Sequence, residues 1–220
     1  MITSRDNEKL KLVRKLHDRK WRDKLGLFVV EGEDLLAEDV DAVELLVAGE
    51  TVDAELLAEV STLAHPPRVV AVYRRDDLPR GLRPVTIALW HVADPGNVGT
   101  LLRAADAFGA GVALSKGCAD PTGPKALRAA MGAVWRVPTC AFDEPAGTRV
   151  ALVPRGGVPL PELAVDGDVV LVLGAEREGL PREVLERCEV QASIPQSGGA
   201  ESLNVAMAGA IALYELCGRR

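Results

Sequence analysis

Apolar residues in the amino-terminal third of the chain alternate between helical spacing and short aliphatic runs. Leu10, Val13 and Leu16 recur every three residues, which predicts an amphipathic helix over residues 7–16. Three short aliphatic runs predict buried strands, at residues 27–30, 43–47 and 69–72. Two further helices are expected, at residues 34–38 and 53–63. This part of the chain therefore predicts a small α/β domain.

A charged segment with Pro and Gly, residues 74–81, separates this region from a second series of strands. Five short and largely unalternating aliphatic runs predict buried strands, at residues 85–89, 112–114, 150–153, 169–173 and 191–194. Helical patterns lie between several of them, so we expect a mostly parallel sheet flanked by helices. Such sheets bind ligands in the loops at the carboxyl ends of their strands.

The composition indicates a folded protein with a locally basic amino end. The 220 residues are 48% hydrophobic, enough for a sizeable core, and the formal net charge is −6. An acidic balance argues against a surface that binds nucleic acid everywhere, but residues 5–24 are rich in Lys and Arg. Four of these are candidate RNA contacts: Arg14, Lys15, Lys20 and Arg22. A solvated helix face is an equally simple interpretation.

The cysteines and the amino terminus exclude several classes of protein. The four cysteines are widely spaced, without a CxxC pair or a His at metal-ligand spacing, so neither a metal site nor a disulfide framework is expected. Residues 1–16 carry charges where a signal peptide needs an apolar run, and no apolar stretch is long enough to span a membrane. We therefore expect a cytoplasmic protein with no membrane partner.

Three glycine-containing segments follow or adjoin the predicted strands, and each could form a loop over a ligand. The first, residues 94–109, begins with the turn-forming sequence Asp-Pro-Gly-Asn. Asn97 is expected to cap the helix that follows, and Arg103 lies roughly 9 Å further along its axis. An ordinary capped amphipathic helix with an exposed Arg would give the same pattern.

The second segment, residues 173–181, follows a strongly apolar run. Its glycines would let a ligand approach the backbone closely, although a plain strand-to-helix turn is equally compatible. Glu176 stands where a dinucleotide-binding fingerprint needs Gly, and its charge would repel a pyrophosphate.

The third segment, residues 194–206, leads from a predicted strand into an apolar helix. Ser202 and Asn204 are polar residues at the start of that helix, where they either cap it or face a ligand. Capping explains only one of the three polar residues Ser197, Glu201 and Ser202. It leaves Asn204 without a role.

Together, these segments resemble the SpoU (TrmH-like) family of RNA 2′-O-ribose methyltransferases, in the SPOUT superfamily. The similarity lies in the order and spacing of three motifs: Asn97-x-Gly99-x3-Arg103, Gly174-x-Glu176-x2-Gly179, and Ile194-Pro195 followed by Ser202-Leu203-Asn204-Val205. It includes further positions between the first two motifs: Asp120-Pro121, Lys125, Arg128 and Met131-Gly132-Ala133. The resemblance therefore covers residues 85–216.

The resemblance implies a fold that the residue pattern alone does not. Family members have a deep trefoil knot in their carboxyl-terminal part, here from about residue 150 to the last helix. The amino-terminal region resembles a small ribosomal-protein-like RNA-binding domain, most clearly over residues 15–36. We expect this RNA-binding domain at residues 1–78, a linker at 79–84 and a knotted methyltransferase domain at 85–220.

The resemblance also assigns roles to individual residues. It implies that S-adenosylmethionine is held by five residues: Leu173, Gly174, Ile194, Gln196 and Leu203. Gln196 departs from the Met that is usual at its position. The implied catalytic residues are Asn97, Arg103, Glu176, Ser202 and Asn204. The resemblance further implies that Arg103 is supplied by the partner protomer of a homodimer. Lys125 and Arg128 are candidate RNA contacts on a predicted helix, where a solvated face is equally compatible.

These features predict methyl transfer from S-adenosylmethionine to a ribose 2′-hydroxyl of RNA. We favour 23S ribosomal RNA over tRNA as substrate, because tRNA-modifying members of the family often lack the amino-terminal domain. A non-catalytic RNA-binding module would leave Asn97, Glu176 and Ser202 without a role. A nucleotide-dependent oxidoreductase would need a GxGxxG motif after its first strand, which the sequence lacks.

Overall fold

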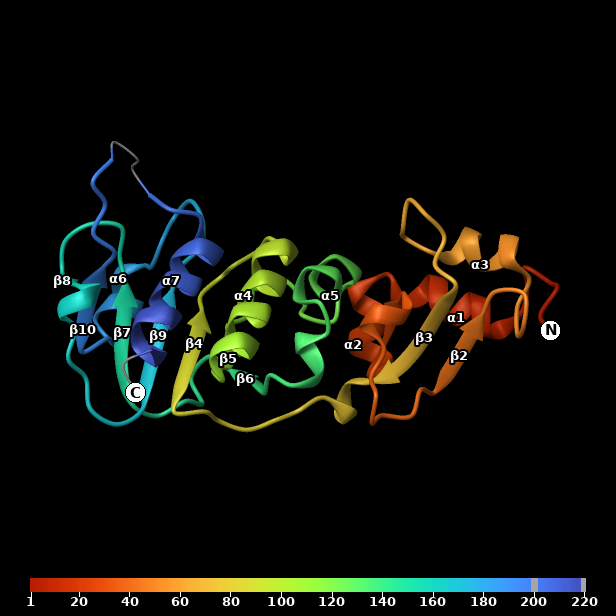
Figure 1. The fold of residues 1–220 in the computed structure, drawn as a ribbon, viewed down its shortest axis with the longest axis horizontal. Helices are drawn as coiled ribbons and strands as arrows, with labels where there is room; N and C mark the ends of the chain where they lie inside the picture. The colour runs from red at the N-terminus through yellow and green to blue at the C-terminus, as the bar shows by residue number, and fades with distance from the viewer. Residues whose placement is uncertain (199–201, 219–220) are drawn as a thin grey trace.

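The chain folds around two sheets that lie side by side along its longest dimension (Figure 1). The computed structural model describes residues 1–198 and 202–218. The amino-terminal sheet has the strand order β1-β3-β2, with both pairs antiparallel. Its region comprises α1 (Glu8–Leu16), α2 (Arg19–Leu25), β1 (Leu27–Glu31), the 3-10 helix η1 (Glu33–Leu35), β2 (Glu44–Val47), α3 (Ala54–Val60) and β3 (Val69–Arg74).

Polar residues at the helix ends explain where the amino-terminal helices begin and stop. The side chains of Asn7, Asp18 and Asp53 accept backbone N–H bonds in the first turns of α1, α2 and α3. α2 stops at Gly26, whose φ of 64° lies in the left-handed region that favours glycine. The next residue begins β1.

Three expectations for this region differ from the structure. The helix expected at residues 34–38 is wrong, because Leu36 is already extended and only the single turn η1 forms. The apolar pattern did not indicate α2, whose buried residue is the charged Arg22. α3 ends earlier than residue 63, because Ser61 is extended.

The carboxyl-terminal sheet has seven strands in the order β6-β5-β4-β9-β7-β10-β8, and all neighbours are parallel. Its region comprises the 3-10 helix η2 (Arg75–Asp77), β4 (Val85–Leu89), α4 (Pro95–Phe108), β5 (Gly111–Leu114), α5 (Pro124–Ala130), η3 (Ala133–Trp135), β6 (Thr139–Ala141), β7 (Thr148–Leu152), β8 (Val158–Pro159), η4 (Leu160–Glu162), β9 (Val169–Leu173), α6 (Arg182–Leu185), β10 (Val190–Ser193) and α7 (Val205–Cys217). The expected α/β class with a mostly parallel sheet is confirmed. β6 and β8 are too short to be predicted from an apolar pattern.

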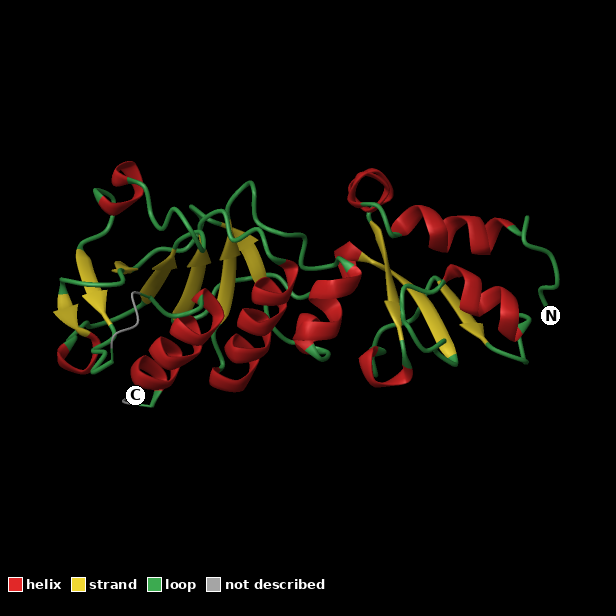
Figure 2. Ribbon diagram, turned by 90° about the horizontal axis from the view of Figure 1, so that it is seen from above, coloured by secondary structure: helices red, strands yellow, loops and turns green. Residues whose placement is uncertain are grey.

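Two glycines allow the helices on one face of this sheet to pack closely (Figure 2). A Cβ atom on Gly99 of α4 would lie 2.3 Å from the carbonyl oxygen of Ala126 in α5. A Cβ atom on Gly209 of α7 would lie 2.4 Å from Cδ2 of Leu101 in α4. α4 is therefore held between α5 and α7, with its amino terminus at the carboxyl edge of the sheet.

A buried carboxylate joins the two regions. Asp120, in the loop between β5 and α5, accepts hydrogen bonds from Arg22 Nε at 2.7 Å and Arg75 Nη2 at 2.6 Å. The side chains of Asp120 and Arg22 are only 8% and 5% exposed. Burial acts to raise the pKa of Asp120, but the Thr122 hydroxyl and the two guanidinium groups together hold that pKa below its ordinary value.

An aromatic cluster gives the same junction an apolar core. Trp135 of η3 lies against Phe28 of β1 and Tyr73 of β3, with ring centroids 5.5 and 4.7 Å apart. Trp135 Nε1 also donates a hydrogen bond to the carbonyl oxygen of Leu35 at 2.9 Å. Leu127 of α5 is buried in this cluster. The two regions therefore share packed apolar surface as well as ion pairs.

Replacing Asp120 by Ala should lower the free energy of unfolding by about 3 kcal/mol, because Arg22 would keep a buried charge without its partner. The wild-type protein should lose the same contribution on acidification. The pKa of Asp120 is lower in the folded than in the unfolded chain, so its stabilisation is present above the unfolded value of 3.8 and disappears as the pH falls through the folded value. Urea unfolding at neutral and acidic pH measures both effects.

The matched control is Asp76→Ala, because the Asp76–Arg80 ion pair is exposed. Its unfolding midpoint should equal that of the wild type. Equal losses in the two variants would mean that Asp120 contributes no more than a surface charge.

Candidate active site

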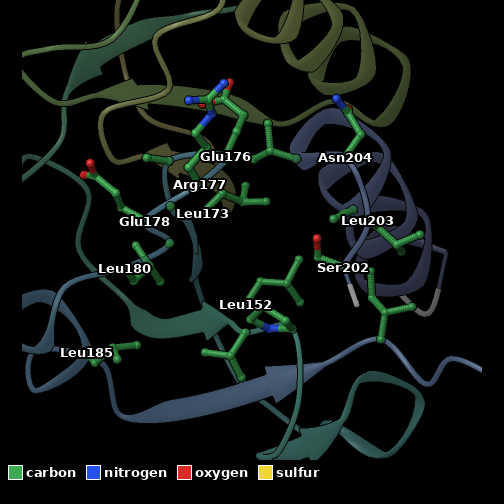
Figure 3. Close-up of a pocket in the computed structure, with 18 of the residues that line it drawn as sticks. Leu152, Leu173, Glu176, Arg177, Glu178, Leu180, Leu185, Ser202, Leu203 and Asn204 are labelled. Atoms are coloured by element: carbon green, nitrogen blue, oxygen red, sulfur yellow. The ribbon is translucent and has the colours of Figure 1, made fainter. Parts of the chain in front are cut away.

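Three loops that are far apart in the sequence meet in one cavity of about 530 Å³ (Figure 3). They follow β9, β7 and β10, which are neighbours in the sheet. Because parallel strands end at the same edge, the sheet order itself brings these loops together. The cavity therefore lies where the sequence places ligand binding, at the carboxyl edge of the sheet.

Every residue expected to hold the cofactor lines this cavity: Leu173, Gly174, Ile194, Gln196 and Leu203. Three of the residues expected to be catalytic line it as well: Glu176, Ser202 and Asn204. In Figure 3, Ser202 and Leu203 lie on the α7 side of the cavity and Leu180 lies on the opposite side. Residues 199–201 of the third segment, Glu201 among them, lie outside the described residues.

Gly174 and Gly179 shape the turn that follows β9. A Cβ atom on Gly174 would lie 2.3 Å from the carbonyl carbon of Gly179, so no larger residue fits there without a backbone shift. Gly179 has a φ of 68°, and its N–H donates to the Ala175 carbonyl oxygen at 3.0 Å. Both glycines are therefore needed for a tight turn that leaves backbone at the cavity wall.

A chain of side-chain hydrogen bonds links the three motifs at the cavity rim. Asn97 Nδ2 donates to Glu176 Oε1 at 2.9 Å, and Asn204 Nδ2 donates to Asn97 Oδ1 at 3.2 Å. Asn97 does not itself line the cavity. It joins the second motif to the third, so the polar groups are held in a fixed arrangement.

The helix caps at this edge differ from those expected. Asp94, rather than Asn97, caps α4, because Pro95 occupies the first helical position and the Asp94 carboxylate accepts the Asn97 N–H at 3.0 Å. Asn204 caps α7, and its Oδ1 accepts the Ala206 N–H at 2.9 Å. The sequence pattern suggests Ser197, Glu201 or Ser202 for this cap instead. Asn204 therefore both caps a helix and completes the polar chain.

Four further apolar residues of the wall are not among those expected from the sequence. Leu152 and Pro154 come from the loop after β7, and Leu180 and Leu185 from the segment that leads through α6. The signal available was the predicted strand at residues 150–153, since its carboxyl end must reach the same edge. The wall suits a flat apolar ring, whereas the carboxylate of Glu176 suits a cationic ligand.

Arg103 lies apart from the cavity of its own chain. It is exposed on α4 and does not line the cavity. Across residues 1–198 and 202–218, no hydrogen-bond or ion-pair partner is found for its guanidinium group. The structure thus brings together four of the five expected catalytic residues and leaves this one free at the surface.

Arg22 is wrong as a candidate RNA contact. Its side chain is buried, and its Nη1 donates to the carbonyl oxygens of Leu16 and His17 at 2.8 Å each. Its Nε is bound to Asp120 and the side chain is only 5% exposed, so the guanidinium is not accessible enough to bind a phosphate. The other candidates in this stretch are exposed: Arg14, Lys15 and Lys20.

Lys125 and Arg128 both contact neighbouring residues of α4 or of the amino-terminal region. Lys125 Nζ donates to Asp94 Oδ2 at 2.9 Å, and this bond lowers the pKa of Asp94. Arg128 Nη1 donates to Thr62 Oγ1 at 3.1 Å and lies 3.6 Å from Glu31 Oε2. Their contact with RNA stays a prediction.

The described part of the chain has neither a cluster of metal ligands nor a membrane-spanning helix. Within residues 1–198 and 202–218, no group of three or more His, Cys, Asp or Glu side chains is placed to hold a metal ion. Over the same ranges, none of the helices combines the length and apolar character needed to cross a membrane.

The chain matches known proteins over most of its length. The SpoU rRNA Methylase family model matches residues 84–214, and the MRM3-like substrate binding domain model matches residues 7–74. The chain is 32% identical to the 23S rRNA (guanosine(2553)-2′-O)-methyltransferase RlmP of Bacillus subtilis, with 99% of each chain covered.

Solved structures with the same fold include two that contain a cofactor. The AdoMet-bound rRNA methyltransferase from Sinorhizobium meliloti has a TM-score of 0.86 and 30% identity, with 97% of this chain and 95% of that chain covered. The SpoU methyltransferase AviRb from Streptomyces viridochromogenes, in complex with AdoMet, has a TM-score of 0.85 and 25% identity, with 97% and 98% covered.

Gly174→Ala should destabilise the protein by about 1–3 kcal/mol, because the added methyl group overlaps the Gly179 backbone. Gly198→Ala is the matched control, since a Cβ atom there meets nothing within 4 Å. Thermal unfolding of both variants measures the difference. A Gly174→Ala protein as stable as the control would show that the turn can open at no cost.

Proposed function

This chain belongs to the SpoU rRNA methylase family, and from that premise we propose that it transfers a methyl group from S-adenosylmethionine to a ribose 2′-hydroxyl of 23S ribosomal RNA. The observation that carries the proposal is the convergence of the second and third motifs on one cavity. The Bacillus relative is named for this reaction on 23S rRNA, and two structures of the same fold hold this cofactor. The proposed ribosomal RNA substrate supports a cytoplasmic location as part of the same proposal.

The residues of the cavity fit S-adenosylmethionine. Leu152 and Leu180 offer apolar surface for the flat adenine ring, and the turn at Gly174 leaves backbone groups within its reach. The carboxylates of Glu176 and Glu178 favour a ligand that carries sulfonium and ammonium charges. The same carboxylates disfavour the pyrophosphate of a dinucleotide.

The chemistry at the ribose depends on alignment. S-adenosylmethionine supplies an electrophilic methyl carbon when bound, and the protein must hold the ribose oxygen in line with it. We assign the hydrogen-bonded chain of Asn97, Glu176 and Asn204 to positioning the ribose. Ser202, on the cavity wall, accepts the hydrogen bond of the 2′-hydroxyl until its proton leaves to water.

We assign Arg103 to the phosphate beside the target ribose. A guanidinium group with a pKa above ~12 is a poor base, whereas its planar fork matches two phosphate oxygens. The free Arg103 side chain outside its own cavity supports action at the cavity of a second protomer.

An exposed apolar stripe on α7 supports a homodimer. Met207, Ile211 and Tyr214 lie at helical spacing and are 57%, 41% and 65% exposed. The Tyr214 ring also contacts Phe108 of α4, with ring centroids 6.2 Å apart. α4, which carries Arg103, and α7 therefore adjoin one apolar surface that a second copy can cover.

The strand order supports the proposed trefoil knot. β10 lies between β7 and β8, although both precede it in the chain, and the chain then returns to α7 beside α4. We further propose that residues 1–78 form the ribosomal-protein-like RNA-binding domain, 79–84 the linker and 85–220 the knotted methyltransferase domain. The two matched family models, over residues 7–74 and 84–214, support this division.

Incubation with radiolabelled S-adenosylmethionine and separate 23S rRNA and tRNA transcripts tests the function directly. Label should enter a ribose of 23S rRNA and be absent from tRNA. Arg103→Ala should lower kcat by about a hundredfold and Arg103→Lys by less, because Lys keeps the charge and loses the fork. Arg68→Ala removes an exposed charge of the amino-terminal region and should retain full activity. A fully active Arg103→Ala protein would remove Arg103 from the mechanism.

Mixed dimers test whether Arg103 acts across the interface. A purified heterodimer of Arg103→Ala and Glu176→Ala protomers has one site with both native residues if Arg103 comes from the partner, so about half of the wild-type activity should return. Each homodimeric variant is the control. If the heterodimer is no more active than the homodimers, Arg103 acts on the cavity of its own chain.

A further inference from the structure

Trp21 of α2 has three lysine side chains around its ring. The Nζ atoms of Lys15, Lys20 and Lys24 lie 5.4, 5.9 and 5.1 Å from the ring centroid. All three lysines are exposed, and Trp21 is partly exposed. We call these four residues the Trp21 patch. Three like charges around one ring repel one another, and an anionic ligand bound among them would offset this repulsion.

The neighbouring cations differ from those of the patch. Most other Lys and Arg side chains of the first two helices and the segment before them have carboxylate partners: Arg5 with Glu59, Lys9 with Glu44, Lys11 with Glu8, Arg19 with Asp23 and Arg22 with Asp120. Among residues 1–198 and 202–218, no carboxylate pairs with the three lysines of the patch. The unpaired charge is therefore concentrated around Trp21.

This combination matches the chemistry of an RNA strand with an unpaired base. Ammonium groups bind phosphates, and a Trp ring stacks on a base only where that base is free of its own helix. A regular duplex offers phosphates but hides the faces of its bases. A protein partner with acidic residues would not need the ring.

The patch is held rigidly to the methyltransferase region by the loop between β5 and α5. Arg19 Nη1 donates to the Cys118 carbonyl oxygen at 3.0 Å, and Arg22 is bound to Asp120. The same loop holds His91, whose backbone N–H donates to Ser115 Oγ at 2.9 Å.

His91 completes the connection to the cavity. Together with Gly179 it lines a hollow beside the turn that forms the cavity wall. Trp90, the residue before His91, donates its backbone N–H to the carbonyl oxygen of Leu173 at 2.8 Å, and Leu173 lines the cavity. A series of contacts therefore runs from α2 to the proposed methyl-donor site.

We propose that the Trp21 patch stacks an unpaired base of the substrate RNA on Trp21 and binds the flanking phosphates through Lys15, Lys20 and Lys24. Because α2 is fixed to the loop beside the cavity, this anchored base sets which ribose reaches the methyl donor. The inference rests on the proposed function for its substrate, but RNA binding by the patch can be measured without catalysis.

Steady-state methylation of 23S rRNA by the full-length protein tests the stacking. Trp21→Ala should raise the KM for RNA about tenfold or more, with kcat and the Kd for S-adenosylmethionine unchanged. Trp21→Phe keeps an aromatic face and should recover most of the loss. An unchanged KM in Trp21→Ala would overturn the proposal. If Trp21→Ala fails to fold, the Trp21→Phe variant and the three lysine variants still test the proposal.

The salt dependence of RNA binding separates phosphate contacts from stacking. In fluorescence anisotropy with a labelled 23S rRNA fragment, Lys15→Ala, Lys20→Ala and Lys24→Ala should each reduce the slope of log Kd against log salt by about 1. Trp21→Ala should weaken binding and leave the slope unchanged. Lys11→Ala removes the same charge from a lysine paired with Glu8 and should have no effect.

Equal effects of Lys11→Ala and Lys20→Ala would reduce the patch to general surface charge and overturn the proposal. The proposed function fails separately, if wild-type protein binds RNA through the patch and yet methylates none.

Discussion

The active site depends on the constraint that neighbouring parallel strands end at one edge of their sheet. β9 lies between β4 and β7, and β10 follows β7, so four loops from distant parts of the sequence leave the sheet side by side. Close approach of the backbone at Gly174 and Gly179 keeps the loop after β9 tight against the cavity. The hydrogen bonds of Asn97 with Glu176 and Asn204 then hold the three motifs in register. The order of the strands therefore brings the three motifs together.

The sequence predicts most of the parallel sheet and much of the cavity wall, for identifiable reasons. Buried parallel strands are short continuous aliphatic runs, and the motif residues adjoin three of them, so their meeting follows from the fold class. Local rules fail where two residues compete for one role, as Asp94 and Asn97 do at the start of α4. They also fail where a partner is distant in sequence. No residue close to Arg22 in the sequence indicates that Arg22 will be buried in an ion pair with Asp120.

The buried Arg22–Asp120 pair also fixes the position of the amino-terminal region relative to the carboxyl-terminal region. Arg22 and Arg75 meet Asp120, and Trp135 packs among Phe28 and Tyr73, so polar and apolar contacts fix one region against the other. The basic stretch of the first helices divides its charges accordingly: some lock the junction, some neutralise nearby acids, and those around Trp21 stay free. The basic stretch of the sequence is therefore divided in the structure into charges paired with carboxylates and unpaired charges around Trp21.

The order of the elements along the chain has a consequence for biosynthesis. Ile194, which follows β10, and Val205 and Ala208 of α7 line the cavity, whereas the amino-terminal sheet is complete at Arg74. The ribosome makes the chain from its amino end, so the amino-terminal region can fold while the cavity is still incomplete. A nascent polypeptide can therefore complete the sheet β1-β3-β2 and the helices packed on it before the strands and helices around the cavity have all been made.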